Sequence, residues 1–395
     1  MSQPNKIKYL CYCTFTVASL YIHKNVQIQL QTKKLHTLKL NPNMIMRAFV
    51  VLLAVLVVHA QAIDVPKLRL VAAKNNMSCI YVFGDSSVDP GNNNNLVTDQ
   101  KVNFLPYGKD FYDGRPTGRF TNGRLATDLI ADALGHTKYL PAYLDPNLTK
   151  AQLVNGVSFA SGGSGYDDLT AQLSNVISLP KQLEYFREYK VKLGRLAGKK
   201  RAQKIVTNAV FLLSMGTNDF LQNYYVEPNR SKQFTIDKYQ DFLMSAMTKY
   251  IKAMHAEGAR RLIVVGMEPF GCIPLIRALK GTIECDDDYN KVALSFNSKI
   301  KSLMATLEPS LGIKNFYIDI YGLVFDTIHN PGKYGFVEAS KGCCGSGLEF
   351  GQSCKGLPTC ADRSKYVYWD AVHFTEEMYK IISEEALKTL MKTLA

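Results

Sequence analysis

Short apolar runs rich in β-branched and aromatic residues recur along the chain and are separated by amphipathic stretches. The runs cover residues 79–83, 156–160, 209–213, 262–265 and 315–320. Apolar residues at helical spacing predict helices over 179–196, 236–255, 289–307 and 376–394. Strands that are apolar on both faces and alternate with helices are typical of a parallel sheet covered on both sides. The sequence therefore predicts an α/β protein with three layers, α/β/α, around a five-stranded parallel sheet.

The first 62 residues differ in charge from the rest of the chain, because they contain seven Lys or Arg and no acidic residue. Within them, Met-Ile-Met-Arg at 44–47 precedes an uncharged apolar run over 48–58, and His-Ala-Gln-Ala at 59–62 has the pattern of a signal-peptidase site. Eleven apolar residues suit the core of a signal peptide and are too few to span a bilayer. We expect 1–62 to be an N-terminal extension with a signal peptide. Residues 63–395 should form a single domain, because no repeat, low-complexity tract or Pro/Gly linker divides them.

The 43 residues before Met44 are unusual ahead of a secretory signal. A translation start at Met44 or Met46 would account for them, and a transit-like extension is the alternative. For the run at 48–58, the alternatives to a signal peptide are a buried helix and a membrane anchor. With a signal peptide we expect secretion to the apoplast or cell wall, and a vacuolar or plastid location is the alternative.

The formal net charge of +13 is strongly basic, but residues 1–62 supply seven of the positive charges and leave an excess of only six elsewhere. Nucleic-acid binding would need a basic stripe with aromatic or helical residues that read the bases, and the sequence has none. We therefore expect no nucleic-acid partner. Outside 48–58 no segment approaches the length of a membrane span, so we expect no stable membrane anchor.

Cysteines after residue 62 are grouped as disulfides on loops would be in an oxidising compartment. The groups are Cys272 with Cys285, and Cys343, Cys344, Cys354 and Cys360 within 18 residues, where three pairings are open. Zinc binding is less favoured, because paired C-x2-C spacing is missing. Cys79 lies in an apolar run and should be a buried free thiol. Glycosylation is expected at the N-x-S/T triplets of Asn76, Asn147 and Asn229.

Small and polar residues follow the predicted strands, at the carboxyl ends where a parallel sheet places its binding site. They are Gly-Asp-Ser at 84–86, Ser-Gly-Gly at 161–163, Gly-Thr-Asn-Asp at 216–219 and Gly-Met-Glu-Pro at 266–269. Ser86 comes directly after the first strand, on a turn that would aim its hydroxyl out of the sheet. A serine at this position also suits a helix N-cap, which is the structural alternative.

A serine nucleophile needs a base, and the histidines after residue 62 are His136, His255, His329 and His373. His136 lies at a predicted helix end, His255 in an amphipathic helix and His329 in a His-Asn-Pro turn. These positions account for the three histidines without a catalytic role. His373 lies three residues after Asp370 and just before a predicted helix, so one short loop can hold both groups. The carboxylate would then orient the imidazole and stabilise its charged form.

An oxyanion would find three donors at the strand ends. They are the backbone N–H groups of Ser86 and Gly163 and the side-chain amide of Asn218. The structural alternatives are an ordinary glycine turn and an Asx turn.

Together these motifs resemble the GDSL-type lipases and esterases of the SGNH hydrolase superfamily, in their plant form. The resemblance covers about residues 78–395 and rests on Phe-Gly-Asp-Ser at 83–86, Gly-Arg-Phe-Thr-Asn-Gly-Arg at 118–124, Gly-Thr-Asn-Asp at 216–219 and Trp-Asp-x-x-His at 369–373. It implies a flavodoxin-like SGNH hydrolase fold, Ser86 as nucleophile and His373 as a base oriented by Asp370. It also implies an oxyanion hole of Ser86, Gly163 (or Gly162) and Asn218, with no metal and no organic cofactor.

The resemblance leads us to expect a secreted ester hydrolase that works through an acyl-enzyme. Its partner would be a small-molecule or polymer-borne ester, with acyl-lipid, acetyl and phenolic esters all open. Two alternatives keep the same fold. One is an acyltransferase in which a sugar or phenolic hydroxyl replaces water, and the other is a catalytically idle binding scaffold.

Overall fold

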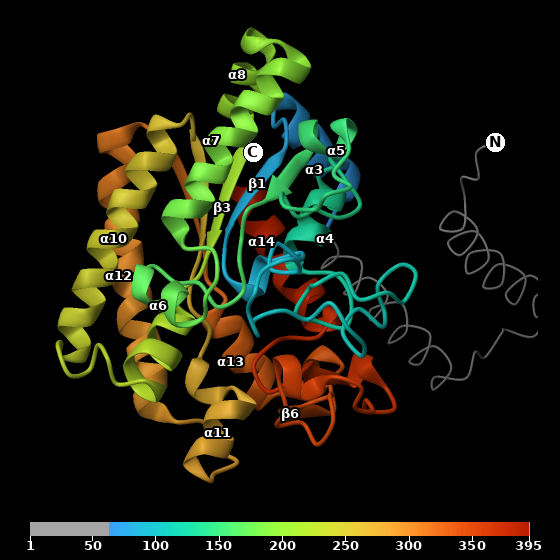
Figure 1. The fold of residues 1–395 in the computed structure, drawn as a ribbon, viewed down its shortest axis with the longest axis vertical. Coiled ribbons are helices and arrows are strands. Elements are labelled where there is room, and N and C mark those ends of the chain that lie inside the picture. The colour runs from blue at the N-terminus through green and yellow to red at the C-terminus, as the bar shows by residue number, and fades with distance from the viewer. Residues whose placement is uncertain (1–62, 395) are drawn as a thin grey trace, which may run out of the picture. The chain divides into compact units, whose positions relative to one another are not determined.

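The computed structural model describes residues 63–394, and the extension and signal peptide predicted at 1–62 lie outside this range (Figure 1). Its main sheet has five strands in the order β2-β1-β3-β4-β5, and all neighbours are parallel. The strands are β1 (Ile80–Gly84), β2 (Gly156–Ser158), β3 (Val210–Ser214), β4 (Arg261–Val265) and β5 (Lys314–Ile318). This order is that of the flavodoxin-like doubly wound sheet. The predicted fold class is therefore confirmed.

Helices cover both faces of the sheet, as Figure 1 shows. Those on one face include α7 (Leu179–Ala197), α10 (Ile236–Ala256) and α12 (Asp287–Leu311), and those on the other include α3 (Val65–Lys74), α4 (Ala126–Ala133) and α14 (Glu376–Leu394). Shorter or peripheral helices are α5 (Lys150–Val154), α6 (Asp168–Leu173), α8 (Lys199–Asn208), α9 (Thr217–Phe220), α11 (Pro274–Lys280) and α13 (Tyr321–His329). The four helices predicted from periodicity are thus present as α7, α10, α12 and α14.

The main core lies between the sheet and these helices. Every residue of β1 is buried, which explains why the strand reads as a continuous apolar run. On one face, the ring of Phe83 stacks on those of Phe159 and Phe211 and meets Phe186 of α7 edge-on. Aromatic pairs of this kind contribute beyond the area that they bury. The sheet is therefore a rigid base for the loops at its carboxyl edge.

The end of β1 needs a glycine. A Cβ on Gly84 would overlap the carbonyl oxygen of Ser214, which ends β3, and lie 2.6 Å from a methyl group of Val88. The backbone N–H of Asp85 also donates to this Ser214 carbonyl. The chain can turn out of the sheet only because nothing occupies that space. Ser86 follows immediately, in the short 3-10 helix Ser86–Val88.

A two-stranded parallel sheet of β6 (Glu338–Gly342) and β7 (Tyr366–Tyr368), which the sequence did not predict, is separate from the main sheet. A second, smaller core lies beside the main one. Its buried members, called the small core below, are Val102, Tyr107, Phe120, Cys343, Cys344, Cys354 and Trp369. Disulfides join Cys343 to Cys360 and Cys344 to Cys354, which selects one of the three open pairings, and Cys272 joins Cys285 as expected. Cys79 is free and buried, and its burial raises the pKa of the thiol to about 11.

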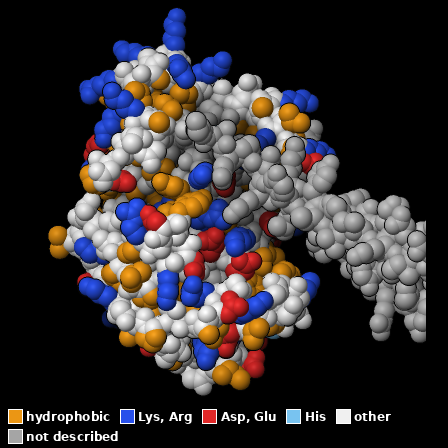
Figure 2. All heavy atoms as spheres, turned by 90° about the vertical axis from the view of Figure 1, so that its right-hand side faces the viewer, with side chains coloured by type: hydrophobic (Ala, Val, Ile, Leu, Met, Phe, Trp, Pro, Cys, Tyr) orange, Lys and Arg blue, Asp and Glu red, His pale blue; other side chains and the backbone are white. Residues whose placement is uncertain are grey.

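Surface features of the described residues bear on possible partners. On the face drawn in Figure 2, basic side chains stand in small groups separated by acidic and apolar ones. Within 63–394 no helix combines the length and the apolar character needed to cross a bilayer. No three His, Cys, Asp or Glu side chains in this range gather as metal ligands would.

Candidate active site

The structure brings Ser86, His373 and Asp370 together at the carboxyl edge of the sheet. Ser86 follows β1, while Asp370 and His373 lie in the loop between β7 and α14. The Nε2 atom of His373 is 2.9 Å from the Ser86 hydroxyl oxygen, and its Nδ1 atom is 2.9 Å from each carboxylate oxygen of Asp370. With Nδ1 protonated and donating to Asp370, Nε2 carries a lone pair aimed at the Ser86 hydroxyl. The three groups therefore lie in the relay order that acyl transfer uses.

The loop that carries the acid and the imidazole is fixed by its own hydrogen bonds. Asp370 is fully buried, and its Oδ1 accepts from the backbone N–H groups of Val372 at 2.8 Å and His373 at 2.7 Å. The carbonyl of His373 accepts in turn from the N–H of Trp369 at 2.7 Å. Because His373 follows Asp370 by three residues, the loop forms a closed turn in which the carboxylate faces the imidazole ring. Phe120 packs against the same ring, with 4.9 Å between ring centroids.

The turn that carries Ser86 is fixed by Asp85. Its carboxylate accepts from the N–H of Ser87 at 2.9 Å and from the Ser87 hydroxyl at 2.8 Å, and that hydroxyl also lies 3.0 Å from the hydroxyl of Ser214. Burial raises the pKa of Asp85 to about 6, although these hydrogen bonds oppose the shift. The helix cap is therefore Asp85 and not Ser86. The N-cap alternative for Ser86 is excluded, and its hydroxyl is left for His373.

The two candidate glycines for the oxyanion hole differ in whether their backbone N–H already has a hydrogen-bond partner. The N–H of Gly162 already donates to the carboxylate of Asp89 at 2.9 Å. The N–H of Gly163 has no hydrogen-bond partner among residues 63–394, and its positive φ of 85° suits glycine. This favours Gly163 as the free donor. Gly163 is not, however, among the residues that line the pocket beside Ser86.

Asn218, the third expected donor, lies in that pocket together with Ser86 and His373. It belongs to the short helix α9 after β3. One hydrogen of its side-chain amide is donated to the carbonyl of Ser164 at 3.0 Å. This bond fixes the amide group and leaves its second hydrogen for a ligand.

Three residues support the glycine loop, and the sequence analysis assigned them no role. Asp89 accepts from Gly162, as described above, and the side chains of Asn92 and Asn93 donate to carbonyl groups of the 158–162 segment. All three side chains are buried. The run Asp-Pro-Gly-Asn-Asn-Asn-Asn at 89–95 was the available signal, because so many amides close together must find partners when buried.

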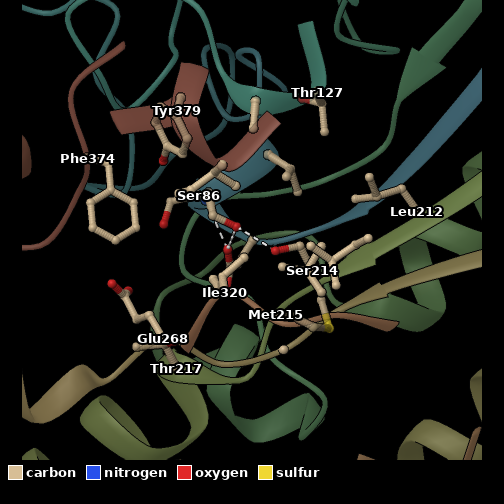
Figure 3. A pocket seen from close by; sticks show the side chains of 18 of the residues that line it. Ser86, Thr127, Leu212, Ser214, Met215, Thr217, Glu268, Ile320, Phe374 and Tyr379 are labelled. Carbon is tan, nitrogen blue, oxygen red and sulfur yellow. Dashed lines mark hydrogen bonds between the residues drawn. The ribbon is translucent and has the colours of Figure 1, made fainter. Parts of the chain in front are cut away.

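The pocket beside Ser86 is mostly apolar (Figure 3). Its apolar lining includes Ile130, Leu212, Ile263, Ile318, Phe374 and Ile382. Glu268, from the segment after β4, also lines it and points toward Phe374. Its Oε2 atom is buried with no hydrogen-bond partner among the described residues. Burial, with the nearby Asp85 charge as a smaller cause, raises the pKa of Glu268 to about 8.

The remaining predicted residues lie elsewhere in the fold. His136, His255 and His329 do not line the pocket. Of the predicted glycosylation residues, Asn76 and Asn147 are exposed and Asn229 is partly exposed.

A flavodoxin-like sheet with a Ser–His–Asp arrangement at its carboxyl edge is typical of the SGNH class of hydrolases. The family described as GDSL-like Lipase/Acylhydrolase matches residues 80–386. The chain is 50% identical over 352 residues to the GDSL esterase/lipase At5g45950 of Arabidopsis thaliana, covering 88% of this chain and 98% of that protein. It is 44% identical over 311 residues to GDSL esterase/lipase APG of the same plant, covering 77% and 88%.

Among solved structures, a variant of Axe2, an acetyl-xylooligosaccharide esterase from Geobacillus Stearmophilus, aligns with a TM-score of 0.38 at 12% identity, covering 79% of this chain and 94% of that one. From the family match and the relatives, the chain belongs to the GDSL esterase/lipase family. It is a carboxylic ester hydrolase.

Proposed function

We propose that this chain is a secreted serine esterase in which Ser86 is the nucleophile, His373 the general base and Asp370 the residue that orients the base. One observation carries the proposal. The His373 ring lies 2.9 Å from Ser86 on one side and 2.9 Å from Asp370 on the other, across 287 residues of sequence. A serine hydroxyl is a weak nucleophile unless a base removes its proton, and this contact supplies the base.

The reaction has two steps. The Ser86 oxygen bonds to the ester carbonyl carbon while its proton passes to Nε2 of His373. The tetrahedral oxyanion accepts hydrogen bonds from the N–H of Ser86, the side chain of Asn218 and the N–H of Gly163. Collapse breaks the bond to the alcohol, which leaves with the proton from His373. Water then attacks the acyl-enzyme by the same route and releases the acid.

The apolar pocket supports an ester with an apolar acyl group. Its walls include side chains of β3, β4, β5, α4 and α14, so an acyl chain bound there would replace water against hydrocarbon. We propose acyl lipids as the substrate class ahead of acetylated polysaccharides and phenolic esters. In a panel of p-nitrophenyl esters, kcat/KM should rise from acetate to longer acyl groups. A maximum at acetate would overturn this choice.

Three disulfides and the accessible glycosylation triplets support an extracellular location, in the apoplast or the cell wall. A signal peptide within 1–62 would direct the chain there. Detection of the tagged protein in wall extracts with a glycan-dependent shift in mass would support this location. Retention inside plastids would contradict it.

The test of the mechanism is Ser86→Ala. Turnover of a short-chain p-nitrophenyl ester should be lost, and labelling by a fluorophosphonate probe should disappear, while thermal unfolding is unchanged. The matched control is Ser245→Ala, which removes an exposed serine hydroxyl of α10 outside the pocket and leaves the Ser86–His373 contact in place. Labelling of Ser86→Ala at the level of the unmodified protein would refute the assignment.

A further inference from the structure

Tyr107 is a fully buried residue of the small core that no motif of the active site includes. Its ring meets the rings of Trp369 and Phe104 edge-on, with centroid distances of 6.0 and 5.8 Å. The backbone beside it is also fixed, because the N–H of Gly108 donates to the carbonyl of Thr121 at 3.0 Å. The hydroxyl of Tyr107 therefore occupies a defined point in the structure.

That hydroxyl has two partners. It accepts a hydrogen bond from the backbone N–H of Gly351 at 2.8 Å and donates one to Oδ2 of Asp370 at 2.6 Å. Because an N–H group can only donate, the contact with Gly351 leaves the hydroxyl hydrogen for the carboxylate. Burial and the charge of Asp370 raise the pKa of Tyr107 well above its usual value, so the phenol keeps the proton that it donates.

Both partners of the hydroxyl are tied to one disulfide-linked segment. Gly351 begins a 3-10 turn that ends at Cys354, which is bonded to Cys344. The N–H groups of Cys343 and Cys344 each donate at 2.9 Å to the carbonyl of Trp369, the residue before Asp370. The disulfides thus hold the two partners of Tyr107 at a fixed separation.

The carboxylate of Asp370 is held on all sides by these contacts. Its Oδ1 accepts the two backbone N–H groups of its own loop, and its Oδ2 is shared between Tyr107 and the Nδ1 atom of His373. We propose that Tyr107 is a positioning residue of this esterase, whose hydroxyl, oriented by Gly351, fixes the carboxylate of Asp370 against His373. The inference rests on the proposed function, because it needs Asp370 to orient the base.

Removal of the hydroxyl has two consequences. The carboxylate loses a fixed donor and gains freedom to rotate away from the ring, which lowers the fraction of molecules with His373 correctly placed. Without the phenol as a hydrogen-bond donor, the negative charge of the carboxylate also interacts more strongly with the imidazolium form of the base. The base should then take up its proton at a higher pH.

Tyr107→Phe in the complete secreted protein tests the proposal, since it removes one oxygen and keeps the ring. We expect kcat for a p-nitrophenyl ester to fall roughly tenfold, the size of effect for a hydrogen bond to a charged group. KM should stay within about twofold, because Tyr107 does not line the pocket. In a plot of kcat/KM against pH, activity falls on the acid side, and this acid limb should move to higher pH by roughly half a unit.

Tyr368→Phe is the matched control. Tyr368 is also fully buried and lies two residues before Asp370, but its hydroxyl has no hydrogen-bond partner among residues 63–394. Neither its kcat nor its acid limb should change. The other ionisable side chains that line the same pocket as His373, namely Asp85, Glu268 and Tyr379, are the same in both variants.

Two further measurements keep the proposal open to refutation. In an Asp370→Ala background, Tyr107→Phe should lower kcat by less than about twofold, because its partner is gone. If Tyr107→Phe does not fold, replacing Tyr107 by 3-fluorotyrosine, a stronger donor of the same shape, should move the acid limb to lower pH.

The outcomes separate the two hypotheses. If the unmodified protein has no turnover that depends on Ser86, both the proposed function and the positioning role are wrong. If the unmodified protein and Tyr368→Phe are active, and Tyr107→Phe equals them in kcat and in acid limb, only the positioning role is overturned. A loss in Tyr107→Phe that persists unchanged without Asp370 overturns it as well.

Discussion

Glu268 carries an unpaired carboxyl in an apolar pocket, and this arrangement should make the protein less stable as the pH rises. The pKa of Glu268 is raised from 4.5 to about 8 in the folded protein, mainly by burial. Between these values the folded protein keeps a proton that the unfolded chain releases. A state that binds more protons loses stability as the pH rises, so the cost grows from about pH 4.5 and levels off above about pH 8.

The magnitude follows from the two pKa values. Each pKa unit corresponds to about 1.36 kcal/mol, so between about pH 5 and pH 7 the cost of Glu268 grows by about 2.5 kcal/mol. Glu268→Gln has almost the same shape and does not titrate. The variant should therefore gain about 2.5 kcal/mol in the free energy of unfolding, relative to the unmodified protein, when the pH is raised over that interval.

Urea unfolding at the two pH values measures this gain. Trp369 is the only tryptophan of the chain and is fully buried, so its fluorescence reports the loss of structure. Glu284→Gln, which changes an exposed side chain, is the control and should give equal differences at both pH values. If the difference between Glu268→Gln and the unmodified protein changes by less than about 0.5 kcal/mol between the two pH values, the reasoning from burial is wrong.

Three other substitutions have defined outcomes. Asn218→Ala should lower kcat on p-nitrophenyl butyrate about 100-fold or more with KM little changed, because it removes a donor to the oxyanion; an unchanged kcat would exclude Asn218 from the hole. Asp370→Asn should lower kcat less than His373→Ala does if Asp370 only orients the ring, and the reverse order in steady-state assays would contradict that role. Gly84→Ala should lower the free energy of unfolding in urea by about 3 kcal/mol, because its methyl group would overlap the Ser214 carbonyl; a stable variant would show that the end of β1 can shift freely.

The main sheet could be predicted because its signals are local. The ends of each predicted strand lie within two residues of the ends of an observed strand. A run that is apolar on both faces can be recognised from its own sequence alone. Ser86 and the Asp370–His373 pair could be proposed as candidates for the same reason. One follows a strand directly and the other two share a short loop. The contact between them depends on the fold class, which places the strand ends together.

The supporting residues could not be predicted, because their partners are distant in sequence. Tyr107 and Asp370 are 263 residues apart, and Tyr107 and Gly351 are 244 residues apart. No periodicity marks a tyrosine whose role depends on two such contacts. The strands β6 and β7 were missed because Glu338–Gly342 is polar and Tyr366–Tyr368 has only three residues. Four nearby cysteines indicated disulfides there, but the pairing required the structure.

The site is divided between two cores, and this division explains why two of the three disulfides lie at the small core. Ser86 stands on the main sheet, which buries large aromatic side chains. Asp370 follows Trp369 of the small core, whose few side chains bury too little apolar surface to order long loops alone. Disulfides there reduce the entropy of the 343–360 loops and so keep the carboxylate aligned. Damage to the small core should therefore reduce the rate of hydrolysis before it unfolds the sheet.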